Sequence, residues 1–270
     1  MSIRQFRPKR HMRRGISGAK KFWLNLIFIS LIGLQISYPL LKGESLRWVT
    51  IATVITGGLF SFIDSLINFG ARFAYILLTA VLIFSFAVEA AGQQTGWPFG
   101  NYTYSQSLGT QIFKVPLIVP LAWLMMSYPV ILVARQSSYN WVFIYGGFGL
   151  MAWDLFLDPQ MVAAGRWSWH FKGASVPLEP NIPLSNAVGW LFAGMILMAM
   201  LNKLLPKERR KKQERTKHVN IFLIWTLFAG VIGNIFFFNN FKVALLGGVF
   251  FTIFLAKFLY KSLLGIPEIN

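Results

Sequence analysis

The chain has 270 residues, of which 55% are hydrophobic and only 13% are charged, and its formal net charge is +17. An ordinary soluble domain has about a quarter charged residues, and a mean hydropathy of +0.54 leaves too little polar surface to cover a water-soluble core. These values exclude a soluble enzyme and a disordered protein. The absence of cysteine excludes thiol nucleophiles, disulfides and thiolate metal sites.

A membrane-crossing helix needs about 20 mostly apolar residues. In chain order, the segments that satisfy this are residues 22–41, 48–68, 71–91, 114–134, 140–163, 183–205, 219–238 and 242–264. They predict an all-α, polytopic membrane helical bundle with about eight transmembrane helices. We therefore expect a basic arm over residues 1–21, one transmembrane domain over 22–264 with a basic loop at 206–218, and a short tail over 265–270.

The basic residues are distributed unequally between the two faces that these spans imply. The N-terminal arm, the loop at 206–218 and the connections on the same face carry 20 of the 26 Lys and Arg residues. Because loops on the cytoplasmic side are enriched in Lys and Arg, both termini are predicted to be cytoplasmic. The net charge is thus attributed to topology and to anionic lipid headgroups, and nucleic acid is not expected as a partner.

Two connections on the opposite face are rich in glycine, proline and aromatic residues. One follows the third span at residues 92–104, and the other follows the fifth span at 165–183. Tyr and Trp gather at membrane interfaces, so the two loops could be parts of an aromatic belt. Alternatively, both loops fold back and cap a cavity, with glycine permitting unusual backbone angles. His170, in the second loop, is expected to be an interfacial residue, not a metal ligand.

Four of the nine acidic residues fall within predicted spans: Asp64, Glu89, Asp154 and Asp158. A charged side chain at the centre of a membrane helix costs ~2.5–3.5 kcal/mol, and such residues usually have functional roles. Asp154 and Asp158 are four residues apart, so they share one helix face and are expected to share a proton. Glu89 and this pair each precede one of the aromatic loops, which predicts that they converge on one site.

Structural readings of these acids remain open. Glu89 and the Asp pair could bond loop backbone or Arg166. Asp64 lies at the opposite end of its span, where a local network with Asn68 and Arg72 is the simpler account, since buried charges are usually paired.

A protonated carboxyl in a dry cavity can donate a proton to an alkene carbon. Aromatic faces would stabilise the resulting carbocation by ~2 kcal/mol or more when desolvated, and a second carboxylate could deprotonate an attacking water. Intramembrane acids also serve proton-coupled transport, so the residues alone leave both chemistries open.

Three blocks of sequence resemble one known family. The first block runs from Glu89 through Gly92 to Thr95-Gly96-Trp97-Pro98-Phe99-Gly100-Asn101-Tyr102-Thr103-Tyr104. The second is Asp154-x-x-x-Asp158-Pro159-Gln160-Met161-Val162 followed by Gly165-x-Trp167-x-Trp169, and the third is Ile182-Pro183-Leu184-Ser185-Asn186 with Gly189-Trp190. Together they resemble the integral-membrane carotenoid biosynthesis family, which contains the CruF-type carotenoid 1′,2′-hydratases and the archaeal bisanhydrobacterioruberin hydratases.

The resemblance implies a cofactor-independent hydro-lyase, without a metal, that adds water to the terminal 1,2 (1′,2′) double bond of an acyclic carotenoid dissolved in the bilayer. It implies a multi-pass protein of a prokaryotic cell membrane, with other carotenoid-pathway enzymes as candidate partners. On this reading Asp154 or Asp158 donates the proton, and Glu89 activates water. The expected substrate-binding residues are Trp97, Phe99, Tyr102, Tyr104, Trp153, Trp167, Trp169 and Asn186. An end-group cyclase and a proton-coupled lipid or small-molecule transporter are the alternatives.

Overall fold

The computed structural model describes residues 18–138, 140–207 and 216–264 and, within them, eight long helices. These are α1 (Gly18–Ser37), α2 (Gly43–Phe69), α3 (Ala71–Thr95), α4 (Val119–Ser137), α5 (Val142–Ala163), α6 (Leu184–Leu204), α7 (Lys217–Phe236) and α8 (Phe241–Leu264). Seven of them are long and apolar enough to cross a membrane. The prediction of a polytopic helical membrane bundle is confirmed.

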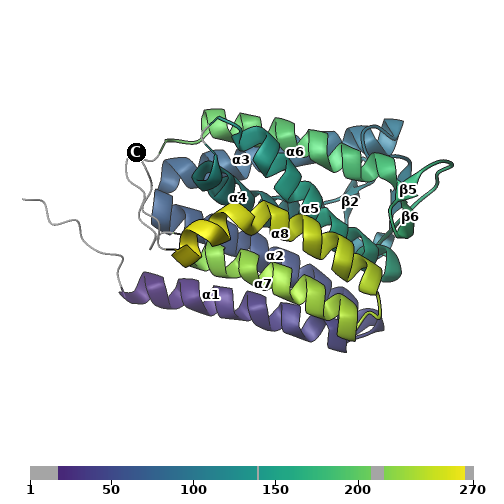
Figure 1. Cartoon of the computed structure of the whole chain (residues 1–270), viewed down its shortest axis with the longest axis horizontal. Helices are drawn as coiled ribbons and strands as arrows, with labels where there is room; N and C mark the ends of the chain where they lie inside the picture. Colours follow the sequence, from purple (N-terminus) through teal and green to yellow (C-terminus); the bar gives the residue numbers. More distant parts are fainter. Residues whose placement is uncertain (1–17, 139, 208–215, 265–270) are drawn as a thin grey trace, which may run out of the picture.

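The helix outside that set of seven is α5, the helix that carries Asp154 and Asp158. It has 22 residues, so at 1.5 Å per residue its length is about 33 Å, enough for a hydrocarbon core of about 30 Å. It packs against α4, α6 and α8 inside the bundle (Figure 1). Helix α5 is therefore enclosed by other helices, which is where a helix with two carboxyls is least costly in a membrane.

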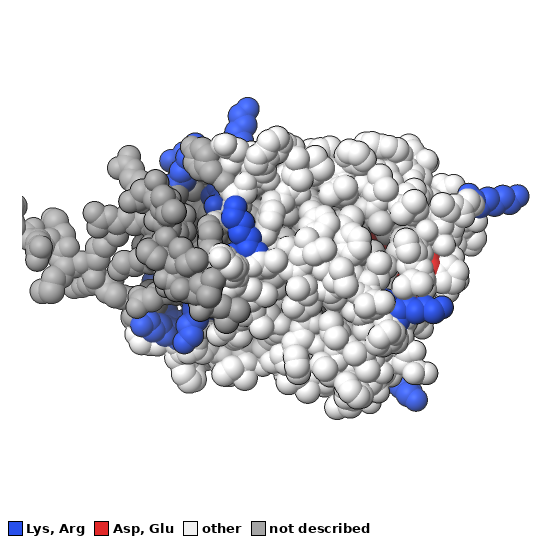
Figure 2. Space-filling model, in the orientation of Figure 1, with Lys and Arg blue, Asp and Glu red and all other residues white. Residues whose placement is uncertain are grey.

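The ends of the bundle differ in composition. Helix α1 begins and α8 ends at the same end of the molecule, which we call the basic end (Figure 1). Within the described residues, nine Lys and Arg residues lie toward this end and six toward the other. The middle of the visible face is nearly free of charge (Figure 2). Most of the basic arm, most of the basic loop and the tail at 265–270 lie outside the described residues, so the predicted imbalance of 20 to 6 and the cytoplasmic termini stay predictions.

The opposite end, which we call the cavity end, carries all six short strands of the described chain. Strand β1 (Tyr102–Tyr104) pairs antiparallel with β4 (Trp167–Trp169). Strands β2 (Gln111–Ile112) and β3 (Val115–Pro116) form one hairpin, and β5 (Ser175–Val176) and β6 (Glu179–Pro183) form another. The β1–β4 pair joins the two aromatic loops that follow α3 and α5.

Local sequence explains how the first loop begins. Gly96 ends α3 with φ of 73°, a left-handed backbone conformation that glycine adopts without strain, and the chain then turns back over the helix ends. The expected fourth span began at residue 114, but the helix begins at Val119 because residues 111–116 form the β2–β3 hairpin.

Candidate active site

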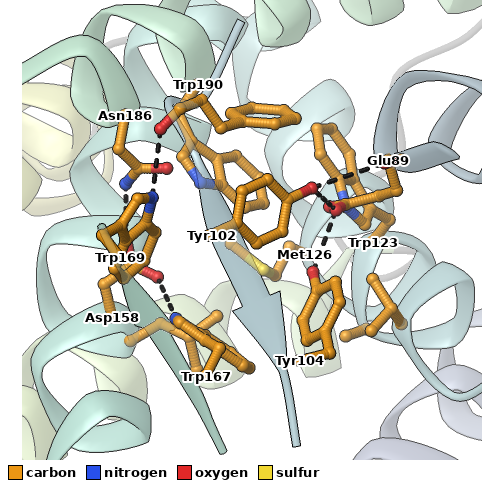
Figure 3. A pocket seen from close by; sticks show the side chains of 14 residues that line it. Glu89, Tyr102, Tyr104, Trp123, Met126, Asp158, Trp167, Trp169, Asn186 and Trp190 are labelled. Atoms are coloured by element: carbon orange, nitrogen blue, oxygen red, sulfur yellow. Dashed lines mark hydrogen bonds between the residues drawn. The ribbon is translucent and has the colours of Figure 1, made fainter. Parts of the chain in front are cut away.

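An aromatic cavity of about 60 Å³ lies at the cavity end, inside the helix bundle and beneath the β1–β4 pair. Its walls come from α3, α4, α5, α6 and both aromatic loops (Figure 3). The lining residues are Glu89, Phe99, Tyr102, Tyr104, Val119, Ala122, Trp123, Met126, Leu157, Asp158, Trp167, Trp169, Asn186 and Trp190. A volume of this size has room for several water molecules or for a small apolar group.

Glu89 is buried on one side of this cavity, and three side chains donate hydrogen bonds to it. The Tyr102 hydroxyl lies 2.5 Å and the Tyr104 hydroxyl 2.9 Å from Glu89 Oε2, and Trp123 Nε1 lies 2.9 Å from Oε1. An indole N–H can only donate, and three donors around one carboxyl suit its ionised, acceptor-only form. The geometry therefore favours a carboxylate at Glu89.

Both phenols are held protonated. Burial, and next the charge of the Glu89 carboxyl, raise the pKa of Tyr102 and of Tyr104 above the ordinary tyrosine value. Each hydroxyl thus stays a donor at neutral pH. Strand β1 presents the two residues on the same side because their positions differ by two.

Asp158 of α5 lies across the cavity from Glu89 (Figure 3). Asp154, four residues earlier in the same helix, does not line this cavity. Both are buried. The Asn186 amide nitrogen donates to Asp158 Oδ2 and, over 3.0 Å, to Asp154 Oδ2. The indole of Trp167 donates to Asp158 Oδ1 over 3.1 Å. A single amide from α6 therefore holds the two carboxyls together, while Asp154 Oδ1 is buried without a hydrogen-bond partner.

Stacked indoles form much of the remaining wall. The rings of Trp123 and Trp190 are parallel within 13° with centroids 4.3 Å apart, and Phe99 packs against both. Trp169 is fixed by a 3.1 Å hydrogen bond from its indole nitrogen to the Phe99 carbonyl. A cavity enclosed by π faces and two sets of carboxyls can stabilise a positive charge on a bound apolar group.

The structure brings most of the sequence-predicted residues together but not all of them. Glu89, Asp158, Asn186, Phe99, Tyr102, Tyr104, Trp167 and Trp169 line the cavity. Trp97 does not line it, and its side chain is 67% exposed. Trp153 points into the bundle, where it packs against Phe222 and Phe251. Asp154 lies behind Asp158 and lines a second, smaller cavity instead.

Sequence reasoning missed two of the main wall residues, Trp123 and Trp190. Trp190 follows Gly189 in the third matching block, so its position was a usable signal. Trp123 lies in α4, outside every block, and only the packing of α4 against α3 places its indole beside Glu89.

Arg166, the ion-pair partner considered for the acids, makes other contacts. Arg166 donates to the Ser107 hydroxyl over 3.1 Å, and no ion pair between Arg166 and Glu89, Asp154 or Asp158 occurs in the described part of the chain. His170 is exposed. Among described residues, no group of three or more His, Asp or Glu side chains is arranged to hold a metal ion.

Fold and site together define a class: a polytopic helical membrane protein with a buried, carboxyl-lined aromatic cavity near one end of the bundle. The family model for "carotenoid biosynthesis protein" matches residues 49–255, so the chain belongs to that family, as the three sequence blocks indicated.

Among curated proteins, the chain is similar to the bisanhydrobacterioruberin hydratase of Haloarcula japonica. The two are 28% identical over 158 residues, which are 55% of this chain and 49% of the relative. The chain thus spans about half the length of that relative. No solved structure matches the chain.

Proposed function

We propose that the protein is a carotenoid hydratase, a hydro-lyase that adds water across the terminal 1,2 (1′,2′) double bond of an acyclic carotenoid. One observation carries this proposal. Asp158, paired with Asp154 through Asn186, and the carboxyl of Glu89 lie on opposite sides of one aromatic cavity (Figure 3). Membership in the carotenoid biosynthesis family and the hydratase name of the distant relative support the choice of substrate class.

The reaction we propose uses Asp158 as the acid. Its proton forms a new C–H bond at one carbon of the double bond as the π bond breaks, which leaves a tertiary carbocation. The π faces of Trp123, Trp190 and Trp169 would stabilise that cation. A water oxygen then bonds to the cationic carbon and gives up one proton, so the net change is the addition of one water.

In this proposal Glu89 takes the proton from that water. A carboxylate offers about four acceptor positions, and Tyr102, Tyr104 and Trp123 occupy three of them. About one position is then left for a water molecule in the cavity. The hydrogen bonds also hold the carboxylate in one orientation, which general base catalysis requires.

The size of the cavity suits one end of a polyene and no more. A volume of about 60 Å³ accepts the terminal part of an isoprenoid chain, so the rest of the molecule would lie in the bilayer. We propose that the chain is a multi-pass protein of a prokaryotic cell membrane. Both termini would lie in the cytoplasm, and the basic arm and loop would contact anionic lipid.

In the proposed reaction Asp158 supplies the proton and Glu89 takes one from water, so the reaction needs neither a redox group nor a metal-bound water. Treatment of the purified protein with EDTA is therefore expected to leave turnover unchanged.

Expression in cells that accumulate an acyclic carotenoid, followed by mass analysis of the extracted pigments, tests the function. Hydration adds the mass of one water per reacted end. An isomer of unchanged mass that absorbs at shorter wavelength would instead indicate an end-group cyclase, in which an internal alkene captures the cation. Unaltered pigment with every plausible acyclic substrate would reject both enzymes.

A further inference from the structure

A second cavity of about 10 Å³ lies behind the carboxyl pair. It is lined by Asp154, Leu155, Asp158, Pro159, Val176, Glu179, Ile182, Asn186 and Ala187. Asp158 and Asn186 line this cavity and the aromatic cavity as well, so these two side chains stand between the two spaces. A volume of 10–15 Å³ holds about one water molecule.

A buried carboxyl oxygen without a protein partner, and a helix carbonyl that lacks its usual donor, mark this second cavity as a place for water. Asp154 is 1% exposed, and its Oδ1 has no hydrogen bond from any described residue. Pro159 has no N–H, so the Leu155 carbonyl loses its usual helical donor four residues on. Both residues line the cavity. A water molecule needs two to four polar partners, and three of the residues that line the cavity, Asp154, Asp158 and Asn186, have polar side chains.

The second cavity lies near the surface of the protein at the cavity end. Glu179 in β6 lines it and is only partly buried, and a 3.0 Å hydrogen bond from Asn240 holds Glu179 Oε1 against the α7–α8 connection. Figure 2 shows acidic atoms recessed between neutral ones toward the end of the molecule that carries β5 and β6. The aromatic cavity, in contrast, is closed on this side by the Asp158–Asn186 contact.

We propose that this second cavity is a water site through which water and protons reach the Asp154–Asp158 pair from the cavity end of the bundle, separately from the carotenoid. This role in turnover rests on the proposed hydratase function. In each cycle Asp158 gives a proton to the alkene, and water forms the C–O bond. The Glu89 carboxylate takes the proton that this water releases and then gives it up to water, which restores the carboxylate. The pair then regains one proton through the second cavity, and charge and atoms balance with one water consumed.

The chain contains no cysteine, so a single introduced thiol can report access to the second cavity. Val176, which is 3% exposed, lines only the second cavity. In Val176→Cys the probe is the silver ion, which is close to water in size and binds thiolate tightly. Thiols left free are then counted by maleimide labelling of the denatured protein and mass analysis. The matched controls are Leu178→Cys, at a 47% exposed hairpin position, and Leu197→Cys, which is fully buried in α6.

We expect silver to block the thiol of Val176→Cys at least ~10-fold faster than that of Leu197→Cys, because thiol reactivity follows access. An acyclic carotenoid should not slow the reaction of silver with Val176→Cys. Silver should also abolish turnover of Val176→Cys while the cysteine-free parent keeps its activity. The proposal is overturned if Val176→Cys reacts as slowly as Leu197→Cys. Protection by carotenoid would overturn it as well, since the cavity would then belong to the substrate site.

Two further results separate the parts of the proposal. If silver blocks the thiol of Val176→Cys but the protein keeps full turnover, the cavity has no role in the reaction. Blocking by silver in a protein that hydrates no carotenoid would reject the hydratase and leave the water site standing, since access is measured without turnover.

Discussion

At the scale of single residues, the two aspartates of α5 are not equivalent. Asp158 lines the aromatic cavity and Asp154 lies behind it, although the same Asn186 amide bonds both. Residue spacing placed them on one helix face, but only the packing of α6 against α5 supplies the amide and separates their roles. In the proposed reaction the pair would hold one proton, and Asp158 alone of the two would touch the substrate.

This difference predicts distinct effects of two isosteric substitutions. Asp158→Asn removes the proton donor and should lower turnover by ~10²–10⁴-fold, the usual contribution of a positioned acid. Asp154→Asn leaves that donor in place and should lower turnover less. Pigment analysis measures turnover, and thermal melting in detergent checks folding. Normal turnover of the folded Asp158→Asn protein would show that the pair is structural.

The second residue-scale prediction concerns the donors to Glu89. Tyr102→Phe and Tyr104→Phe each remove one hydrogen bond to a carboxylate, an interaction worth ~1.5–3 kcal/mol, so each should lower turnover at least ~10-fold. Tyr75→Phe is the matched control, because the Tyr75 side chain in α3 is 59% exposed. This variant should have the turnover of the parent. If all three variants match the parent in turnover, the proposed role of Glu89 fails.

At the scale of secondary-structure elements, the position of the first aromatic loop depends on close approach to α6. A side chain at Gly189 would place its Cβ 2.6 Å from the Pro98 carbonyl oxygen and 2.9 Å from the Phe99 ring. The loop can therefore lie on α6 only where the helix has no Cβ. This contact sets Phe99 against Trp190 in the cavity wall.

Gly189→Ala should consequently displace the loop. Overpacking of this kind costs ~1–3 kcal/mol, and the misplaced Phe99 should reduce turnover together with thermal stability. Gly33→Ala in α1, where a Cβ would meet nothing within 4 Å, should be neutral or slightly stabilising, because alanine favours helix over glycine. Equal behaviour of the two variants would contradict the packing argument.

At the scale of the whole molecule, a second buried polar network lies near the basic end, away from the aromatic cavity. Asp64 is fully buried in α2 and accepts hydrogen bonds from Tyr128 over 2.5 Å and from Asn68 over 3.0 Å. The ring of His218 in α7 lies 3.7 Å from Asp64 and 2.8 Å from Asn25 of α1. Residues of α2, α4 and α7 therefore meet at Asp64, and His218 links this group to Asn25 of α1. The expected contact with Asn68 is present, and the other partners are distant in sequence.

Asp64→Ala should lower the melting temperature without changing the product. Removal of the buried carboxyl that accepts from Tyr128 and Asn68 costs ~1–3 kcal/mol. No residue of this network lines the aromatic cavity. Ser85→Ala, which removes a buried hydroxyl bonded only within α3, serves as the control and should cost less. A change in the pigment made by Asp64→Ala would show that the network takes part in the reaction.

Sequence by itself determined the fold class, most helix positions and the membership of the family. Length and hydropathy are local properties, so each span could be recognised alone, and the cost of burying Glu89 and Asp158 singled them out. Only the tertiary structure decided which side chains share a cavity. Trp123 reached Glu89, Trp97 stayed exposed and Trp153 turned into the bundle. These outcomes depend on contacts between helices and loops that are distant in the chain. Hydropathy and residue spacing are local properties, so they do not predict such contacts.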